Sequence, residues 1–419
     1  MWRFVSRKEN WSFLRFGLAQ LISQFGDRVH QMALVGLIAQ RCPGSSFELA
    51  KLLAFTIIPV FIIGPIAGVY VDRWNRKTTL FVCDLLRGGL VLLIAFYVMD
   101  LPSIIPVYAV VFVIFAFSRF YVPAKMSLVP QMVDEGDLHI ANSLVTVTGM
   151  IALVLGALFG GLIVEHNGPR GGFLFDAVTF FISAALVFSV SGFRRWQINK
   201  NKIVAAGREA VAAHKDVWHE IKDGISYIQS NQGIRFIFLM MSVLFAAAGA
   251  IYVIIIVFIQ QSFGSVTKDL GFLAVPLGIG LFTGSMLYGR YGQKVSRFKT
   301  IFWSLILGGI MIAVFAAAVS VTQNRVIAAG LAAVLGLVIG PAVIAANTVI
   351  HTVCSQEMSG KVFAALEFVM HLAFLLAMLV SAYIAEFIGR QWILASIGVI
   401  FLGVGLFGLF QYKEKHNSL

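Results

Sequence analysis

Apolar residues fill most of the chain in runs that are long enough to cross a lipid bilayer as α-helices. A hydrocarbon core roughly 30 Å thick needs about 20 predominantly apolar residues per helix. The runs lack the alternation of apolar and polar residues that marks a transmembrane strand. The pattern therefore predicts an all-α membrane protein with about twelve transmembrane helices of this length. We expect them near 13–39, 48–71, 78–99, 103–124, 139–165, 172–193, 234–260, 271–290, 299–321, 325–350, 361–388 and 391–410.

Composition agrees with this pattern. Hydrophobic residues make up 59% of the chain and charged residues only 12%, whereas soluble domains carry about 25% charged residues. The mean hydropathy is +0.88. A multi-pass protein of the cell membrane is therefore expected, with the lipid bilayer as its surroundings.

The net charge of +12 has a positional explanation. Basic residues gather before the first run, at 73–77, through 194–235 and at 290–299, whereas the loops of the opposite face hold few. Such a bias marks the cytoplasmic side of a membrane protein, so both termini are predicted to be cytoplasmic. The basic balance indicates orientation and not nucleic-acid binding. Cysteine spacing indicates neither a disulfide framework nor a metal site, and no cofactor is expected.

One long polar segment, residues 194–233, separates the runs into two sets of six. We predict an N-terminal six-helix bundle over 1–193, a basic cytoplasmic linker over 194–233, and a C-terminal six-helix bundle with a short basic tail over 234–419. The apolar linker residues at near-helical spacing are Val217, Trp218, Ile221, Ile225 and Ile228. They indicate either an amphipathic helix on the inner membrane face or a plain solvated linker.

The two halves share a faint repeat. The segment "GVYVDRWNRK" follows the second run, and "GRYGQKVSRFK" follows the eighth. Four residues of the first segment each have a counterpart 221 positions later in the second. The pairs are Gly68 and Gly289, Asp72 and Gln293, Arg73 and Lys294, and Arg76 and Arg297. Matches at equivalent places in two halves are typical of secondary transporters with internal repeats.

The stretch "GPIAGVYVDRWNRKTTL" resembles the signature loop of the major facilitator superfamily. The resemblance implies two pseudo-symmetric six-helix bundles (the major facilitator fold) that usually work as a monomer. It also implies a cytoplasmic gating motif that latches the halves in the outward-facing state. The motif residues are Gly68, Asp72, Arg73, Arg76 and Lys77. A cluster of basic residues that only sets the topology is the simpler alternative.

Three further stretches, "SRFYVPAKMSLVPQMVDEGDLHIANSL", "FLFDAVTFFISAAL" and "HEIKDGISYIQSNQGIR", resemble the branch that holds macrolide-efflux proteins and the enterobactin exporter. "SQFGD" with "PAK" is also similar to the lysophospholipid transporter. In the fifth run, "GALFGG" resembles the antiporter motif, with Ala157 where the family has proline. Its glycines, Gly156, Gly160 and Gly161, are expected to let two helices pack closely.

A polar stripe crosses the first run. Gln20, Gln24, Asp27 and Gln31 recur at helical spacing and so share one helix face. A charged residue at the centre of a membrane helix costs about 2.5–3.5 kcal/mol and normally faces a water-filled cavity or a partner. We therefore predict that the stripe borders a cavity that holds substrate or protons.

Other ionisable residues also fall inside the predicted helices. Asp84 and Arg87 are three residues apart and can form a buried ion pair, which can be structural only. Arg119 is a candidate for a cavity cation, a partner of a carboxylate, or a side chain that reaches the interface. Asp176 lies near the start of its run and is interpreted as an ordinary helix-start carboxylate.

Glu367 and His371 are four residues apart in the eleventh run, so a carboxylate and an imidazole can meet there. Together with Asp27 they are the candidates for the proton pathway. The resulting hypothesis is a secondary active transporter that exports an amphipathic small molecule of drug, macrolide or siderophore type in exchange for protons. A lysophospholipid transporter is the alternative. The remote alternative is a membrane-embedded enzyme that uses His351 and Cys354 as an imidazole–thiol pair. It is remote because nothing in the sequence orients the imidazole.

Overall fold

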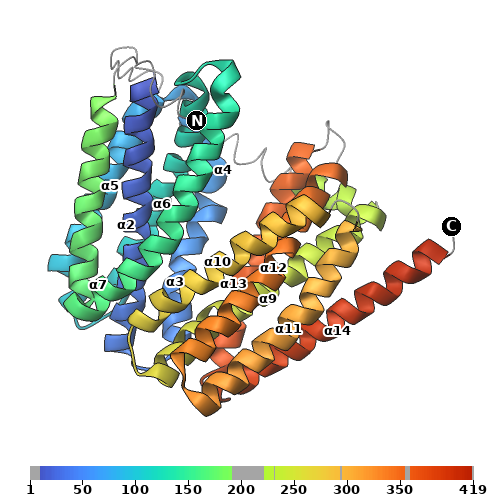
Figure 1. The fold of residues 1–419 in the computed structure, drawn as a ribbon. Helices are drawn as coiled ribbons and strands as arrows, with labels where there is room; N and C mark the ends of the chain where they lie inside the picture. The colour runs from blue at the N-terminus through green and yellow to red at the C-terminus, as the bar shows by residue number, and fades with distance from the viewer. Residues whose placement is uncertain (1–9, 191–220, 231, 293–294, 354–358, 418–419) are drawn as a thin grey trace. The chain divides into compact units, whose positions relative to one another are not determined.

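The computed structural model describes residues 10–190, 221–230, 232–292, 295–353 and 359–417. Regular structure in these ranges is helical (Figure 1). The first half holds α2 (Trp11–Arg41), α3 (Ser46–Ile62), α4 (Gly64–Arg73), α5 (Arg76–Phe96), α6 (Ile105–Leu128) and α7 (Leu138–Ser189), with short 3-10 turns η2 (Val98–Asp100), η3 (Val129–Gln131) and η4 (Glu135–Asp137). The second half holds α9 (Gln232–Phe263), α10 (Lys268–Tyr291), α11 (Arg297–Thr322), α12 (Arg325–Val353), α13 (Ser359–Ile384) and α14 (Arg390–Asn417).

Nine helical segments within the described ranges are long and apolar enough to cross a membrane. The all-helical membrane architecture expected from the sequence is confirmed. Helix α2 is 31 residues long, but it is not among the nine because its amides and charged residues lower its hydropathy. The total number of spans and the side on which the termini lie stay predictions.

Proline is involved at two boundaries of the predicted runs. The run near 48–71 differs from the prediction and forms two helices, α3 and α4, that meet at Ile63; Pro65 at the start of α4 has no N–H to continue the ladder. The runs near 139–165 and 172–193 both fall within α7, and the backbone leaves helical geometry between them, where the sequence placed the break. The helix is kinked at Gly168, where φ is 69°, directly before Pro169. Glycine accepts this backbone conformation without steric cost.

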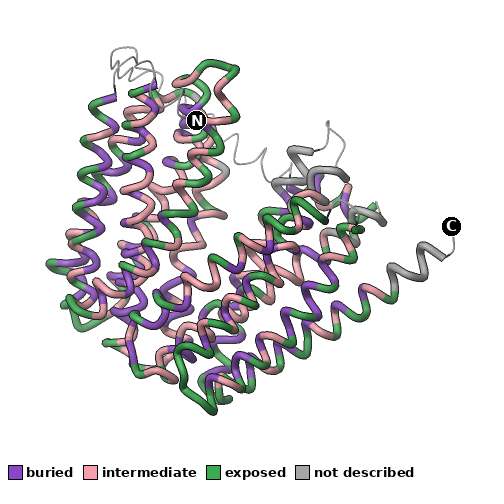
Figure 2. The backbone as a smooth tube through the Cα atoms, viewed as in Figure 1, coloured by how far each residue is buried: buried purple, intermediate pink, exposed green. Residues whose placement is uncertain are grey.

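Contacts between helices divide the chain into two units. The first unit comprises Met1–Arg41 and Leu52–Trp218, and the second comprises Cys42–Lys51 and His219–Leu419. In the first unit α7 packs against α2 and α5, and α5 also packs against α6. In the second unit α10 packs against α12, α11 against α14, and α9 against α13. Figure 2 shows buried positions recurring along these helices between exposed ones.

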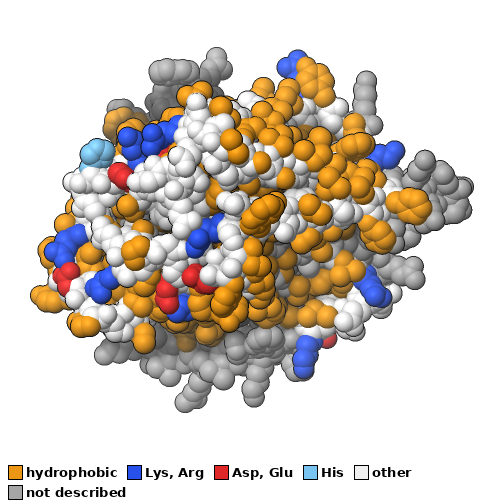
Figure 3. Space-filling model, turned by 90° about the horizontal axis from the view of Figure 1, so that it is seen from below, with side chains coloured by type: hydrophobic (Ala, Val, Ile, Leu, Met, Phe, Trp, Pro, Cys, Tyr) orange, Lys and Arg blue, Asp and Glu red, His pale blue; other side chains and the backbone are white. Residues whose placement is uncertain are grey.

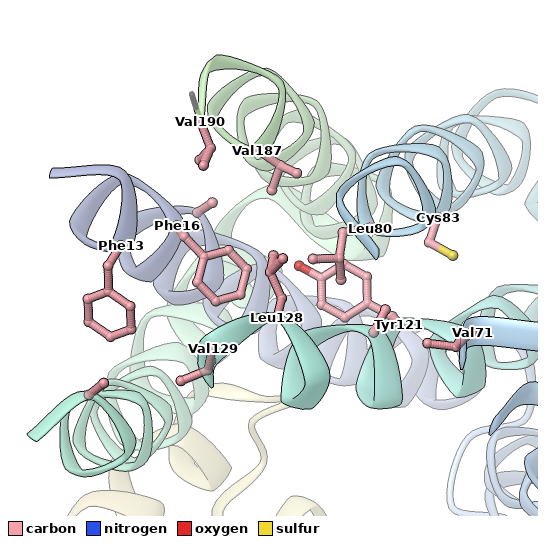
Figure 4. Close-up of a cluster of buried hydrophobic side chains, with 13 residues drawn as sticks. Phe13, Phe16, Val71, Leu80, Cys83, Tyr121, Leu128, Val129, Val187 and Val190 are labelled. Carbon is pink, nitrogen blue, oxygen red and sulfur yellow. The ribbon is translucent and has the colours of Figure 1, made fainter. Parts of the chain in front are cut away.

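A cluster of buried apolar side chains fills one end of the first unit (Figure 4). Phe13 and Phe16 enter it from α2, Leu80 from α5, and Leu128 from α6. Tyr121 and Cys83 border the cluster. Close packing of such large side chains gains many dispersion contacts, which help to drive helix association in a membrane. The cluster therefore fixes the helices on which the polar residues of this unit lie.

Close backbone contact between α10 and α12 characterises the second unit. A Cβ atom at Gly280 would lie 2.0 Å from the carbonyl oxygen of Ala333, and one at Gly284 would lie 2.3 Å from that of Leu337. Only glycine allows helices to approach so closely, as small residues do in membrane bundles generally.

Part of the basic linker forms a short helix. Residues 221–230 are helical, with Ile221 and Ile228 buried, whereas Val217 and Trp218 lie outside the described residues. The apolar side of this short helix is thus covered by protein.

Many large apolar side chains elsewhere are exposed, as expected for surfaces that face lipid. In Figure 3 charged side chains stand singly or in small groups among hydrophobic ones on the face that is seen.

Candidate functional site

The polar stripe of α2 borders an ionic cluster inside the first unit. The side chain of Asp27 is 42% exposed, and its Oδ1 lies 3.5 Å from Nη1 of Arg87 on α5. Gln20 is almost fully buried, whereas Gln24 and Gln31 are half-buried. Gln24 donates to the backbone oxygen of Gln20 and Gln31 accepts from Arg28, so both amides bond within α2 itself. Asp27 is the stripe residue that reaches a charged partner on another helix.

Arg87 is the centre of the cluster. Its side chain is 3% exposed, and Nη2 donates to Oδ1 of Asp84, which is 0% exposed. The guanidinium also lies 4.5 Å from the ring centroid of Tyr121 and 4.3 Å from that of Phe180. Aromatic faces stabilise a desolvated cation. Arg87 is therefore held by two carboxylates and two rings.

Hydrogen bonds extend the cluster to residues that the sequence did not single out. Oδ2 of Asp84 accepts from the Ser183 hydroxyl at 2.7 Å and from the Tyr121 hydroxyl at 3.5 Å. Tyr121 in turn accepts from Nε2 of Gln20. The network thus links α2, α5, α6 and α7. Hydroxyl residues at these positions carry no distinctive spacing, so only the fold reveals their role.

A second buried pair joins α2 and α7. Nδ1 of His30 lies 3.0 Å from Oδ2 of Asp176, with 3% and 0% of the two side chains exposed. The interpretation of Asp176 as an ordinary helix-start carboxylate is wrong, because Asp176 lies inside the part of α7 that follows the kink at Gly168 and is buried against His30 of α2. His30 escaped notice because a single histidine in an apolar run gives no sequence signal.

The glycines of "GALFGG" lie in the contact between α7 and α2. A Cβ at Gly156 would lie 2.7 Å from Cβ of Arg28, and one at Gly160 would lie 3.0 Å from Cα of Val29. Gly161 is buried beside them. These residues let α2 approach α7, which places His30 opposite Asp176. A role in antiport stays a prediction.

The cytoplasmic gating motif is only partly described. A Cβ at Gly68 would meet no atom within 4 Å, so the close helix approach expected at this glycine is not seen. The side chain of Asp72 lies outside the described part of the structure. Arg73 is exposed and Arg76 half-buried. Lys77 donates to the backbone oxygens of Phe188 and Val190 at 2.8 and 2.6 Å and so caps the end of α7.

The remaining candidates are Arg119 in the first unit and Glu367 and His371 in the second. Arg119 is half-buried on α6. Glu367 is exposed, and Nδ1 of His371 donates to its backbone oxygen at 2.8 Å, so this contact involves the backbone and not the carboxylate. Cys354 and the side chain of His351 lie outside the described residues. Among the described histidines, cysteines and carboxylates, no group has the arrangement of a metal site.

Comparison with known proteins gives a consistent result. The family model described as Major Facilitator Superfamily matches residues 16–369 and 237–418. Macrolide efflux protein A of Streptococcus pyogenes is 23% identical over 413 residues, which cover 94% of each chain. The MFS-type transporter YfiS of Bacillus subtilis (strain 168) is 23% identical over 407 residues, with 94% of this chain and 92% of YfiS covered.

Solved structures support the same fold. A bacterial homologue of the iron transporter ferroportin, in an inward-facing state, superimposes with a TM-score of 0.71 at 13% identity. The match covers 96% of this chain and 99% of the other. At this identity the likeness concerns the fold and not the transported compound.

Proposed function

The chain belongs to the major facilitator superfamily, and we propose that it is a secondary active transporter that exports an amphipathic small molecule in exchange for protons. Membership makes it a multi-pass transporter and not an enzyme. The direction, the coupling ion, the class of substrate, a monomeric state and a place in the bacterial plasma membrane belong to the proposal.

The contact between Asp27 and Arg87 is the observation that supports proton coupling. With Asp27 and Asp84 ionised, the cluster of two carboxylates and one guanidinium carries a net charge of −1. A proton on Asp27 makes the cluster neutral. Enclosing a neutral group in a dry bundle costs much less than enclosing a charged one. Protonation of Asp27 therefore favours the transporter state in which the cluster is closed to water.

The exposure of the three residues fits these roles. Asp27 is 42% exposed, whereas Arg87 is 3% exposed. Asp84 is 0% exposed and is bound by Arg87 and Ser183. These exposures support Asp27 as the proposed proton-exchanging carboxylate, whereas Arg87 and Ser183 hold Asp84 in place.

The proposed class of substrate comes from the similarity of this chain to a relative that is named for its substrate. The relative from Streptococcus pyogenes is named as a macrolide efflux protein, and a macrolide is a large amphipathic compound. Erythromycin is therefore the first substrate to test. The gating role of Gly68, Asp72, Arg73, Arg76 and Lys77 stays the one that the family resemblance implies. Arg119, Glu367 and His371 stay candidates because they are ionisable residues inside predicted membrane helices.

Inside-out membrane vesicles test the proposal. An imposed pH gradient, acidic inside, is expected to drive accumulation of radiolabelled erythromycin by the wild type. Asp27→Asn should reduce that accumulation about tenfold or more, within the range of typical coupling free energies. Asp100→Asn is the matched control, because Asp100 also pairs with an arginine, Arg170, at 2.5 Å but is exposed.

Two results would contradict the proposal. Accumulation that ignores the pH gradient, or that persists in Asp27→Asn, rules out coupling through Asp27. Glu367→Gln in the same vesicles then shows whether the other candidate carries the proton. Movement of labelled lysophospholipid, without movement of erythromycin, would replace the exporter by the lipid transporter.

A further inference from the structure

The pair formed by His30 and Asp176 is separate from the ionic cluster around Arg87. Nδ1 of the histidine lies 3.0 Å from Oδ2 of the carboxylate. The two side chains come from α2 and from the part of α7 that follows the kink at Gly168. A buried imidazole beside a buried carboxylate can bind protons near neutral pH.

Apolar groups and backbone enclose the pair. The imidazole lies 5.3 Å from the ring centroid of Phe173 and 6.2 Å from that of Phe115. On the other side, a Cβ at Gly26 would lie 2.6 Å from Oδ1 of Asp176, so the α2 backbone closes over the carboxylate. Thr179 directs its hydroxyl at 2.7 Å to the backbone oxygen of Asp176. The same hydroxyl lies 3.5 Å from Oδ1 of Asp176, so the imidazole, at 3.0 Å from Oδ2, is the nearest polar side chain to this carboxylate.

One ring nitrogen is left to accept a proton. Both ring nitrogens of His30 and Oδ2 of Asp176 are buried without a hydrogen bond of good geometry among the described residues, but Nδ1 lies 3.0 Å from Oδ2 and Nε2 has no such neighbour. With Nδ1 protonated and Asp176 ionised, the pair carries a net charge of −1. A second proton, on Nε2, makes the pair neutral overall. Neutrality is strongly favoured in apolar surroundings unless another cation compensates the charge.

The neighbouring charges do not supply that cation. The charged groups that act on Asp176 besides His30 are Asp27 on α2 and Arg87 on α5. Asp27 is itself negative, and Arg87 already binds Asp84 and Asp27. From α6, the group that faces the imidazole is the uncharged ring of Phe115. The pair therefore lacks a counter-charge of its own.

His30 follows Asp27 by three residues along α2. Residues three apart on a helix lie on one face, so His30 is on the turn next to Asp27. Asp27 is 42% exposed and His30 is 3% exposed. We propose that His30 and Asp176 form a second proton-binding site, which receives the proton that Asp27 takes from water. The O–H bond of the Asp27 carboxyl breaks, and an N–H bond forms at Nε2 of His30. This proposal rests on the proposed function.

Histidine NMR tests the site without any substrate. The purified protein, labelled with ¹⁵N in its eight histidines, is titrated in detergent between about pH 5 and 9, the range in which histidine changes charge. His30→Gln identifies the His30 signals. The expected result is a change of ring protonation within this range. Its midpoint should move by about one pH unit or more in Asp176→Asn, as expected on loss of a close charge.

A ring that keeps one protonation state throughout would overturn the proposal, since a purely structural hydrogen bond behaves in that way. The wild-type titration alone decides this point, even if Asp176→Asn does not fold. Asp100→Asn should leave the midpoint in place.

The vesicle assay separates this inference from the proposed function. His30→Gln is expected to lose accumulation of erythromycin driven by the pH gradient, as Asp27→Asn does. If His30→Gln keeps the wild-type response while Asp27→Asn loses it, the second site is wrong and the exporter stands. If the wild type itself ignores the gradient, the exporter is wrong, and the NMR titration still reports whether the pair binds protons.

Discussion

Arg87 lies between two carboxylates of unequal accessibility: it donates to the buried Asp84 on its own helix and lies 3.5 Å from the half-exposed Asp27 on α2. One guanidinium thus bridges a buried carboxylate and an accessible one. Tyr121 and Phe180 enclose the buried pair.

Removing the cation alone should be costly. Arg87→Met leaves Asp84 buried and unpaired, and breaking a buried pair in this way typically destabilises by about 3–5 kcal/mol. The double variant Asp84→Asn/Arg87→Met leaves no buried charge at the pair and should recover part of this loss. Thermal unfolding in detergent measures both. Equal stability of the single and double variants would show that the pair is not the origin of the effect.

Gly26 is predicted to tolerate no side chain. A Cβ there would lie 1.8 Å from the Thr179 hydroxyl, so Gly26→Ala should destabilise by about 1–3 kcal/mol through overpacking. Gly17→Ala is the control on the same helix, because a Cβ at Gly17 meets nothing within 4 Å. That change should be neutral or stabilise by up to about 1 kcal/mol. Unfolding midpoints that rank the two variants in the opposite order would contradict the packing of α2 against α7.

Lys77 is expected to act on stability through the end of α7. Its ammonium group binds the oxygens of Phe188 and Val190, where a cation stabilises a helix C-terminus by about 0.3–1 kcal/mol. Lys77→Met should lower the unfolding temperature, and Lys77→Arg should preserve it. If both variants unfold like the wild type but transport slowly, the gating role implied by the family resemblance is favoured over the capping role.

Arg390 should control access to the segment before α3. It donates to the Ser46 hydroxyl at 3.0 Å, to Oε1 of Gln261 at 3.1 Å, and to the backbone oxygen of Gly44. Glu386 accepts from the Ser45 hydroxyl and from the backbone N–H of Phe47 in the same segment. Losing these bonds frees the backbone around Cys42. Arg390→Ala is therefore expected to label several-fold faster with maleimide at Cys42 than its parent.

The labelling experiment uses a chain in which Cys354 is replaced by serine, and Cys83 is buried. Arg170→Ala is the matched control, since Arg170 binds Asp100 in a different loop. An unchanged rate in Arg390→Ala would mean that the segment is held by other contacts.

The sequence by itself determined the membrane class, because the length of an apolar run and the number of its charges decide whether it can cross a bilayer. It also determined the family, through a charged loop motif whose residues are adjacent in the chain. It singled out Asp27, since a carboxylate inside an apolar helix is conspicuous without any fold. The pairing of Asp84 with Arg87 was predictable for the same local reason, their spacing of three residues.

Only the tertiary structure decided which distant side chains meet. His30 and Asp176 are far apart in the chain, and each has an unremarkable sequence context. Gln20, Tyr121 and Ser183 come from three helices and share one network only because α7 packs against both α2 and α5, and α5 packs against α6. Periodicity reports which face of a helix is polar, but the partner of that face depends on how helices are packed by glycine contacts such as those at Gly156 and Gly160.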